Sequence, residues 1–238
     1  MRIDIITLFP ELFEGLKNHS IVGRAIGSGK VELVTHNLRD WASGKYKSVD
    51  DHPYGGGVGM VLRFDILHKA LSDIKSNLKS QMANSQIITI LLTPQGQVYK
   101  QTMAQDLAQA QSLILICGHY EGFDERIREY VDMEISIGDY VLTGGELAAM
   151  VIVDSVARLL PGVLGDDKSS IDESHSPSTS SGSTRLLEYP QYTRPEEYDG
   201  KSVPKILLGG NHKEIDAWRK EQAEERTKVR RPDLLNVG

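Results

Sequence analysis

Cysteine and long apolar runs are scarce in this chain of 238 residues. Cys117 is the only cysteine, so no internal disulfide can form, and a cytoplasmic location is expected. No apolar run approaches the ~20 residues that span a bilayer. The chain begins in a strand-like segment, residues 2–6, and we expect no signal peptide. Because Cys117 ends an apolar strand, we expect a small buried hydrophobe rather than a reactive thiol.

The motifs of several enzyme classes are also absent. The seven histidines are scattered, with no HExxH and no paired cysteines, so no metal site is expected. No GxSxG elbow is present, which disfavours a Ser-His-Asp hydrolase. The glycine-rich residues 54–60 (YGGGVGM) lack the Lys-Ser/Thr of a P-loop. A plain loop and a ligand-contacting loop remain equal alternatives there, although the preceding Asp50, Asp51 and His52 suit nucleotide recognition.

The net charge of −6 argues mildly against a general nucleic-acid binder. The average hides a basic segment, because residues 218–231 carry six Lys or Arg against three Glu. An acidic protein can still bind RNA through a local basic face, so the total charge leaves both alternatives open.

Apolar runs alternate with segments of helical composition. Strands are predicted at residues 2–9, 31–34, 87–92, 113–117 and 133–137, and helices at 11–16, 64–74, 97–110 and 145–160. This alternation predicts an α/β fold with a mostly parallel sheet. In the last of these helices, Leu147, Val151, Ser155 and Leu159 form a stripe at i, i+4 spacing.

The composition changes after residue 164. Residues 165–184 are rich in Ser, Gly and Asp, which predicts a flexible linker. A charged helix is expected from Glu214 to about Arg226, within a second, small helical domain. We therefore divide the chain into residues 1–164, a linker at 165–185, and residues 186–238.

Three glycine-bearing loops adjoin the predicted strands. They are TPQG (93–96), CGHYEG (117–122) and the stretch from Gly138 to Glu146, which reopens as a helix. A strand that ends in glycine and leads into a helix can hold a ligand with backbone groups. The three loops together predict a small-molecule site lined mainly by main chain.

Two charged features near this region have open interpretations. Asp172 and Glu173 could supply a general base from the linker, or could be solvated linker charges. Arg158, near the end of the helix predicted at 145–160, could interact with the helix dipole or could be a guanidinium positioned for a planar, electron-rich substrate.

Taken together, these motifs resemble those of the bacterial tRNA (guanine-N1)-methyltransferases of the SPOUT class. The resemblance runs from end to end and is carried by LFP (8–10), VDDHPYGGG (49–57), TPQG (93–96), CGHYEGFDER (117–126), SIGDYVLTGGE (136–146), PGVLG (161–165), YTRP (192–195), GNH (210–212), WR (218–219) and RRP (230–232). It implies a SPOUT-type parallel sheet with a deep trefoil knot, a homodimer whose active sites are shared between subunits, and S-adenosylmethionine (SAM) as methyl donor. The implied substrate is the guanosine immediately 3′ of the anticodon, at position 37 of tRNA. Whether Mg²⁺ is required stays open.

The resemblance also assigns residues. The implied cofactor residues are Thr93, Pro94, Gly118, Tyr120, Glu121, Ile137, Gly138, Asp139, Tyr140, Val141, Leu142, Gly144 and Gly145. Candidates for contacts with the tRNA anticodon stem-loop are Asp51, Tyr54, Gly59, Arg194, Asn211, His212, Arg226, Arg230 and Arg231. For each basic residue of the C-terminal helix, a solvated face with i, i+4 ion pairs is an equal alternative.

The implied catalytic groups are a linker Asp that takes the N1 proton and an Arg, matching Arg158, near guanine O6. This chain departs from the family pattern, because Glu173 and not Asp precedes Ser174, with Asp172 one residue earlier. We name Glu173 first because its register with Ser174 is kept. A methyltransferase acting on another RNA and a non-catalytic RNA-binding homologue are the rival interpretations.

Overall fold

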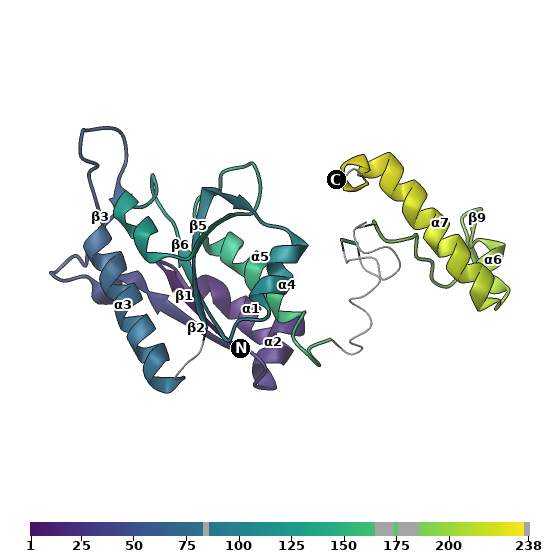
Figure 1. Cartoon of the computed structure of the whole chain (residues 1–238), viewed down its shortest axis with the longest axis horizontal. Helices are drawn as coiled ribbons and strands as arrows, with labels where there is room; N and C mark the ends of the chain where they lie inside the picture. Colours follow the sequence, from purple (N-terminus) through teal and green to yellow (C-terminus); the bar gives the residue numbers. More distant parts are fainter. Residues whose placement is uncertain (83–85, 165–173, 176–185, 236–238) are drawn as a thin grey trace. The chain divides into compact units, whose positions relative to one another are not determined.

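The computed structural model describes residues 1–82, 86–164, 174–175 and 186–235. The chain divides into two compact units, Met1–Gly165 and Asp166–Gly238. Figure 1 labels many of the helices and strands of both units. The two candidate bases, Asp172 and Glu173, lie outside the described residues.

The first unit is built on a five-stranded sheet with the order β2-β1-β6-β5-β7, and all neighbouring strands are parallel. The strands are β1 (Arg2–Thr7), β2 (Glu32–Asn37), β5 (Ile87–Val98), β6 (Ser112–Cys117) and β7 (Met133–Ser136). Every residue of the central β6 is buried, as expected for a continuous apolar strand covered on both faces. The predicted α/β class with a parallel sheet is therefore confirmed.

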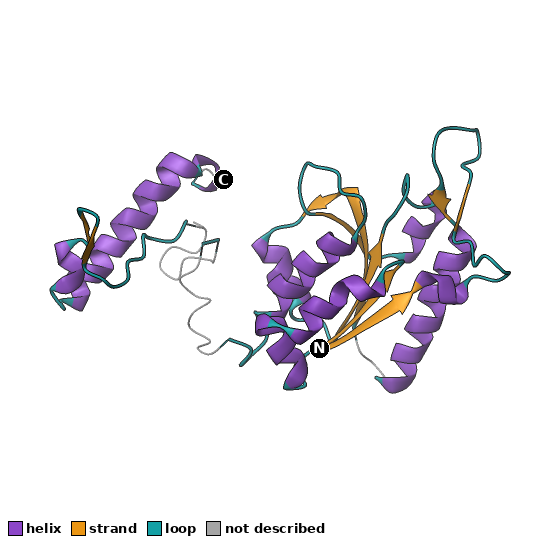
Figure 2. Cartoon of the chain, turned by 180° about the vertical axis from the view of Figure 1, so that it is seen from behind, coloured by secondary structure: helices purple, strands orange, loops and turns teal. Residues whose placement is uncertain are grey.

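Helices cover both faces of this sheet (Figures 1 and 2). One layer contains α1 (Glu14–Asn18), α2 (Ser20–Gly27), α4 (Gln101–Leu107), α5 (Glu146–Ala157) and the 3-10 helix η1 (Pro10–Phe13). The other contains α3 (Phe64–Gln81) with the 3-10 helices η2 (Leu38–Trp41) and η3 (Glu125–Tyr130). Each layer packs on its own cluster of buried apolar side chains.

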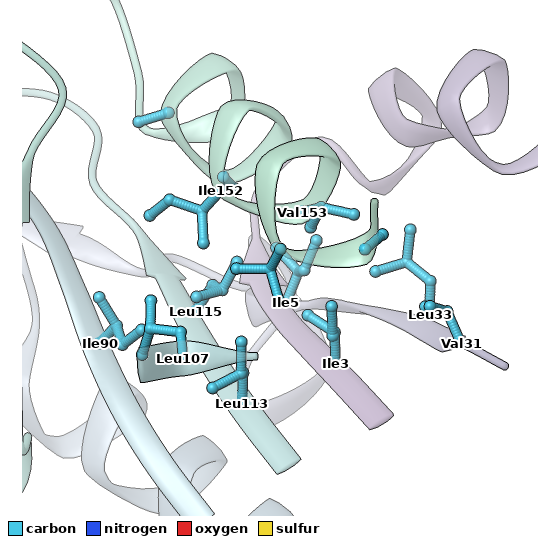
Figure 3. Close-up of a cluster of buried hydrophobic side chains, with 14 of the residues drawn as sticks. Ile3, Ile5, Val31, Leu33, Ile90, Leu107, Leu113, Leu115, Ile152 and Val153 are labelled. Atoms are coloured by element: carbon cyan, nitrogen blue, oxygen red, sulfur yellow. The ribbon is translucent and has the colours of Figure 1, made fainter. Parts of the chain in front are cut away.

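Successive side chains of β1 point to opposite faces of the sheet and so pack against different helix layers. Ile3 and Ile5 belong to the cluster beneath α5, whereas Ile6 belongs to the cluster beneath α3. Figure 3 shows Ile152 and Val153 of α5 above Ile5 and its neighbours on the sheet. The core therefore fixes α5, whose first turn follows one of the predicted ligand loops, directly on the central strands.

Several predicted boundaries were wrong. The helix predicted at 97–110 begins at Gln101, because Gln97 and Val98 still pair with β7 after a register shift that follows Leu92. Helix α3 continues to Gln81 rather than residue 74, and Leu78 extends its buried face by one turn. Helix α2 and the short antiparallel pair β3 (Asp50–Asp51) and β4 (Val61–Leu62) were not predicted.

The described residues of the second unit form helices and one short pair of strands. These are the antiparallel pair β8 (Glu197–Tyr198) and β9 (Lys201–Ser202), then α6 (Lys205–Leu208), α7 (His212–Arg230) and η5 (Pro232–Leu234). Helix α7 is longer than the predicted 214–226 and buries Ile215, Ala223 and Thr227. In neither unit does a described helix have the length and apolarity needed to cross a membrane.

Candidate functional site

A cavity of about 470 Å³ lies at the carboxyl ends of β6 and β7, beside residues 92–95, where the pairing of β5 with β7 is interrupted. Its walls come from residues 92–95, residues 118–123 and residues 135–145, and thus from all three predicted glycine-bearing loops. Ligands of open parallel sheets bind at the carboxyl ends of the strands, and typical ligand pockets measure ~300–1,000 Å³. The cavity therefore has the position and the size of a small-molecule site.

The structure brings the implied cofactor residues together around this cavity. All of them line it except Asp139. Sequence reasoning missed further lining side chains, among them Gln95, His119, Phe123, Glu125 and Arg128. His119 and Phe123 lie inside the CGHYEGFDER motif, which could have identified them. Arg128 reaches the cavity from η3, and no local pattern indicates that.

At two glycines of the cavity loops, the main chain approaches a neighbouring segment closely. The N–H of Gly145 donates to the carbonyl of Gly118 at 2.9 Å. A Cβ on Gly145 would lie 2.7 Å from Cα of Cys117, and one on Gly96 would lie 2.5 Å from the carbonyl carbon of Glu134. Because backbone atoms cannot yield as side-chain ends can, only glycine allows these approaches.

A buried acid lies just outside the lining. Glu146, in the first turn of α5, is 4% exposed. Its Oε1 accepts a hydrogen bond of 2.6 Å from the Thr7 hydroxyl, and its Oε2 lies 2.9 Å from Nε2 of His119.

Burial, with a smaller contribution from the nearby Glu146, raises the pKa of the Cys117 thiol well above its usual value. Cys117 is therefore a buried, protonated side chain, as expected, and not a nucleophile.

Arg128 links the outer parts of the cavity wall. Its guanidinium pairs with Glu125 of η3 at 2.9 Å and with Glu134 of β7, and it donates to the side-chain oxygen of Gln95. Three segments that are separate in sequence are thus tied together at the rim. This cluster stabilises the TPQG wall against η3 and β7.

The glycine-rich loop between β3 and β4 is joined to the cavity loop. The N–H of Glu121 donates to the carbonyl of Met60 at 3.0 Å, and the N–H of Leu62 donates to Gly122 at 2.9 Å. A Cβ on Gly59 would lie 2.4 Å from Cγ of Glu121. Of the tRNA candidates in this unit, Gly59 therefore borders the cavity loop, whereas Asp51 is exposed in β3 and Tyr54 is exposed in the glycine-rich loop.

Arg158 is not at the cavity of its own chain. It is half-buried at the C-terminus of α5, the opposite end from the glycine-bearing loop. The 12 residues of α5 place the two ends about 18 Å apart at ~1.5 Å of rise per residue.

The remaining tRNA candidates lie in the second unit. They are Arg194, Asn211, His212, Arg226, Arg230 and Arg231. Asn211 and His212 begin α7, and Arg230 ends it. Arg226 donates to the carbonyl of Glu188 at 3.1 Å, and Arg231 forms two hydrogen bonds with Asp233. Arg194, His212, Arg230 and Arg231 are all exposed, and Arg231 is held by the carboxylate of Asp233 beside it.

A protein metal site is not formed by the residues that the structure describes. No group of three or more His, Cys, Asp or Glu side chains among them is arranged to hold an ion.

Comparison with known proteins gives matches along the whole chain. Residues 1–237 match the family model described as tRNA (Guanine-1)-methyltransferase TrmD. A tRNA (guanine-N(1)-)-methyltransferase from Staphylococcus carnosus is 51% identical over 99% of this chain and 91% of its own length. The enzyme of that name from Halalkalibacterium halodurans is 53% identical over the same shares of the two chains. The one from Carboxydothermus hydrogenoformans is 52% identical over 100% of this chain and 88% of its own. The chain therefore belongs to the tRNA (guanine-1)-methyltransferase family.

Proposed function

We propose that the protein transfers a methyl group from SAM to N1 of the guanosine immediately 3′ of the anticodon, position 37 of tRNA. The observation that carries this proposal is the cavity at the ends of β6 and β7, beside residues 92–95 of β5, in a chain of this family. It is lined by the residues, all but Asp139, that the resemblance associates with SAM. An RNA methyltransferase that acts elsewhere would have the same cavity, so the position within tRNA rests on the family.

The residues around the cavity suit SAM. Gly118, Gly138 and Gly144 present bare main chain, which can donate and accept hydrogen bonds at close range. Leu92, Ile137 and Leu142 supply apolar surface for a purine ring. When bound, SAM supplies a methyl group already activated on a sulfonium, so the protein has to align rather than activate it.

In this proposal, the residues of the protein that take part in the chemistry act on the guanine. N1 carries a proton that ionises well above neutral pH, so it needs a base before it becomes a nucleophile. We assign that role to a carboxylate of the linker, Glu173 first and Asp172 second. As N1 loses its proton, negative charge spreads to O6, where the guanidinium of Arg158 would stabilise it.

The place of Arg158 supports an active site shared in a homodimer. In one chain it lies about a helix length from the cavity. On α5, Leu147 and Val151 of the predicted stripe are 58% and 44% exposed, an apolar strip between the two ends of the helix. Antiparallel packing of this strip on its copy would bring Arg158 of one chain toward the glycine-bearing end of α5 in the other.

We also propose the trefoil knot and the division of labour between the units. Support for the knot is the close main-chain crossing of Gly145 with Cys117 and Gly118. In this proposal residues 1–164 hold SAM and residues 186–238 contact the anticodon stem-loop together with residues 45–54. The exposed Arg194, His212 and Arg230 suit phosphate contacts.

Methyl transfer tests the proposal. Purified protein is incubated with SAM labelled with tritium in its methyl group and with an unmodified tRNA transcript. We expect label in the transcript, and none when the guanosine at position 37 is replaced. Equal labelling of the replaced transcript would favour another RNA position, and no labelling of any transcript would favour a non-catalytic homologue.

A matched pair of variants tests the base. Glu173→Gln and Asp172→Asn each remove one carboxylate charge at nearly constant volume. We expect Glu173→Gln to lower the single-turnover methyl-transfer rate by about 10²–10⁴-fold, the usual contribution of a general base, and Asp172→Asn to change it little. The opposite ranking would move the role to Asp172.

A further inference from the structure

Glu146 is a buried carboxylate that the proposed chemistry does not use. It is 4% exposed and is not among the residues that line the cavity. Carboxylates are rarely buried without partners, because removing the charge from water is costly. Its position therefore calls for specific hydrogen bonds that offset this cost.

Those hydrogen bonds form a chain across three segments. The N–H of Phe9 donates to the Thr7 hydroxyl at 3.0 Å, and that hydroxyl donates to Glu146 Oε1. Glu146 Oε2 contacts Nε2 of His119. A carboxylate oxygen can accept a hydrogen bond from this ring nitrogen in the tautomer that protonates Nε2. One side chain thus connects the end of β1, the loop after β6 and the first turn of α5, and buried polar networks of this kind are rigid when every member is satisfied.

These hydrogen-bonded side chains lie against two walls of the cavity. A Cβ on Gly144 would lie 2.4 Å from Glu146 Oε2 and 2.3 Å from His119 Nε2, so both groups press on the glycine-bearing loop. The next residue, Gly145, bonds to the carbonyl of Gly118 on the opposite wall. The His119 ring lines the cavity and is held between Glu146 and the Phe9 ring, whose centroid is 5.0 Å away.

We propose that Glu146 is a positioning residue of the cofactor cavity, which fixes the spacing of the Gly118–His119 wall and the Gly144–Gly145 wall. The inference rests on the proposed binding of SAM in this cavity. Replacing the carboxylate by an amide keeps the shape but removes the charge and places an NH₂ donor opposite either His119 or Thr7. The two walls then lose their common acceptor, and the cavity loses its preformed spacing.

The chain offers a matched control in Asp4. Asp4 is also a buried carboxylate with a histidine partner, His36 at 2.7 Å, but neither residue lines the cavity. Asp4→Asn therefore reports the loss of a buried carboxylate without the loss of cavity contacts.

The experiment compares Glu146→Gln and Asp4→Asn by calorimetric titration with SAM at a temperature where both variants are folded. We expect Glu146→Gln to raise the Kd for SAM about tenfold, the scale of one charge-assisted hydrogen bond, and Asp4→Asn to leave it within about twofold. Glu146→Asp, which keeps the charge on a shorter arm, should recover part of the affinity. An unchanged Kd in Glu146→Gln, or equal weakening in both variants, would overturn the proposal.

A second measurement does not depend on SAM. Hydrogen exchange, followed by mass spectrometry over residues 117–122 and 141–147, reports the two walls directly. We expect exchange about tenfold faster there in Glu146→Gln, and wild-type exchange in Asp4→Asn. If the wild type fails to bind SAM but this difference appears, the proposed function fails and the positioning role stands. If exchange is unchanged, the positioning role fails.

A milder variant covers the case in which Glu146→Gln does not fold. Thr7→Val removes one hydroxyl at nearly constant shape and leaves the contact between Glu146 and His119 in place. We expect about a threefold rise in the Kd for SAM, and an unchanged Kd would contradict the proposal.

Discussion

Strand β1 carries a buried acidic network on each of its faces, and both networks pair a carboxylate with a histidine. Asp4, on the α3 face, contacts His36 of β2 and Arg2. Thr7, on the α5 face, contacts Glu146, which contacts His119. The first network joins neighbouring strands within the sheet, whereas the second joins a strand end, a loop and a helix start beside the cavity.

The partners explain the difference in role. Asp4 receives two hydrogen bonds from the Arg2 guanidinium, so its charge is compensated by a permanent cation. Glu146 instead contacts a hydroxyl, that of Thr7, and an imidazole, that of His119, which lines the cavity. Similar chemistry therefore stabilises the sheet in one place and shapes the ligand site in the other.

Substitution of Gly145, where the two cavity walls meet, should have the strongest effect. In Gly145→Ala the new Cβ meets Cα of Cys117 and the N of Gly118, both at 2.7 Å. We expect the affinity for SAM to fall about a hundredfold, which corresponds to about 3 kcal/mol of overpacking strain. Gly15→Ala is the control, because no atom lies within 4 Å of its added Cβ, and it should bind SAM like the wild type in calorimetry. Wild-type affinity for SAM in Gly145→Ala would show that binding does not need the close approach of Gly145 to Cys117 and Gly118.

Substitution of Asp4, in the network within the sheet, should lower stability. Burial would raise the pKa of Asp4, but hydrogen bonds from His36 and Arg2 outweigh it, so the pKa lies below its usual 3.8. A lowered folded pKa gives a contribution that is full above about pH 3.8 and is lost as the pH falls through the folded value. At neutral pH we expect Asp4→Asn to lower the free energy of unfolding by about 2 kcal/mol.

Urea unfolding at a series of pH values checks this prediction. The gap in stability between the wild type and Asp4→Asn should be constant near neutral pH and should narrow below about pH 3.8, the usual value. A gap that does not change with pH would show that the ionised carboxylate is not what Asp4 contributes.

Double variants should separate the two networks of β1 by a small difference in coupling energy. Thr7→Val should lower the free energy of unfolding by about 1 kcal/mol, one hydrogen bond. Combined with Glu146→Gln it should show a coupling energy of at least ~0.5 kcal/mol, because the two side chains share a bond. Combined with Asp4→Asn it should be additive, since Asp4 lies three residues along the strand, about 10 Å, on the other face. Equal coupling in both pairs would remove the distinction.

Much of this architecture could be predicted from sequence because the signals are local. Apolar runs such as 113–117 are typical of buried parallel strands, and the glycines of 93–96, 117–122 and 138–146 by themselves indicate a main-chain site. The helix start at Gln101 was missed because β5 resumes pairing at Gln97, a contact with β7 that the composition of β5 does not reveal.

The rest depends on contacts between distant segments. Sequence alone does not show that Glu146 is buried against Thr7, since the two are joined only by packing of α5 on β1. The same holds for Arg128 at the cavity rim and for the distance of Arg158 from the cavity of its own chain. Asp172 and Glu173 fall outside the described residues, so the assignment of the base stays a prediction.

Mass-spectrometric mapping of the methylated nucleoside tests the proposed reaction and the role of the cavity walls together. An unmodified tRNA transcript is incubated with SAM and the wild type, Gly145→Ala or Asp4→Asn, and is then digested and sequenced. With SAM kept near the wild-type Kd, the expected result is 1-methylguanosine at position 37 with the wild type and with Asp4→Asn, and only a small fraction of that product with Gly145→Ala. A methyl group on another atom or at another position, or equal product from all three proteins, would contradict it.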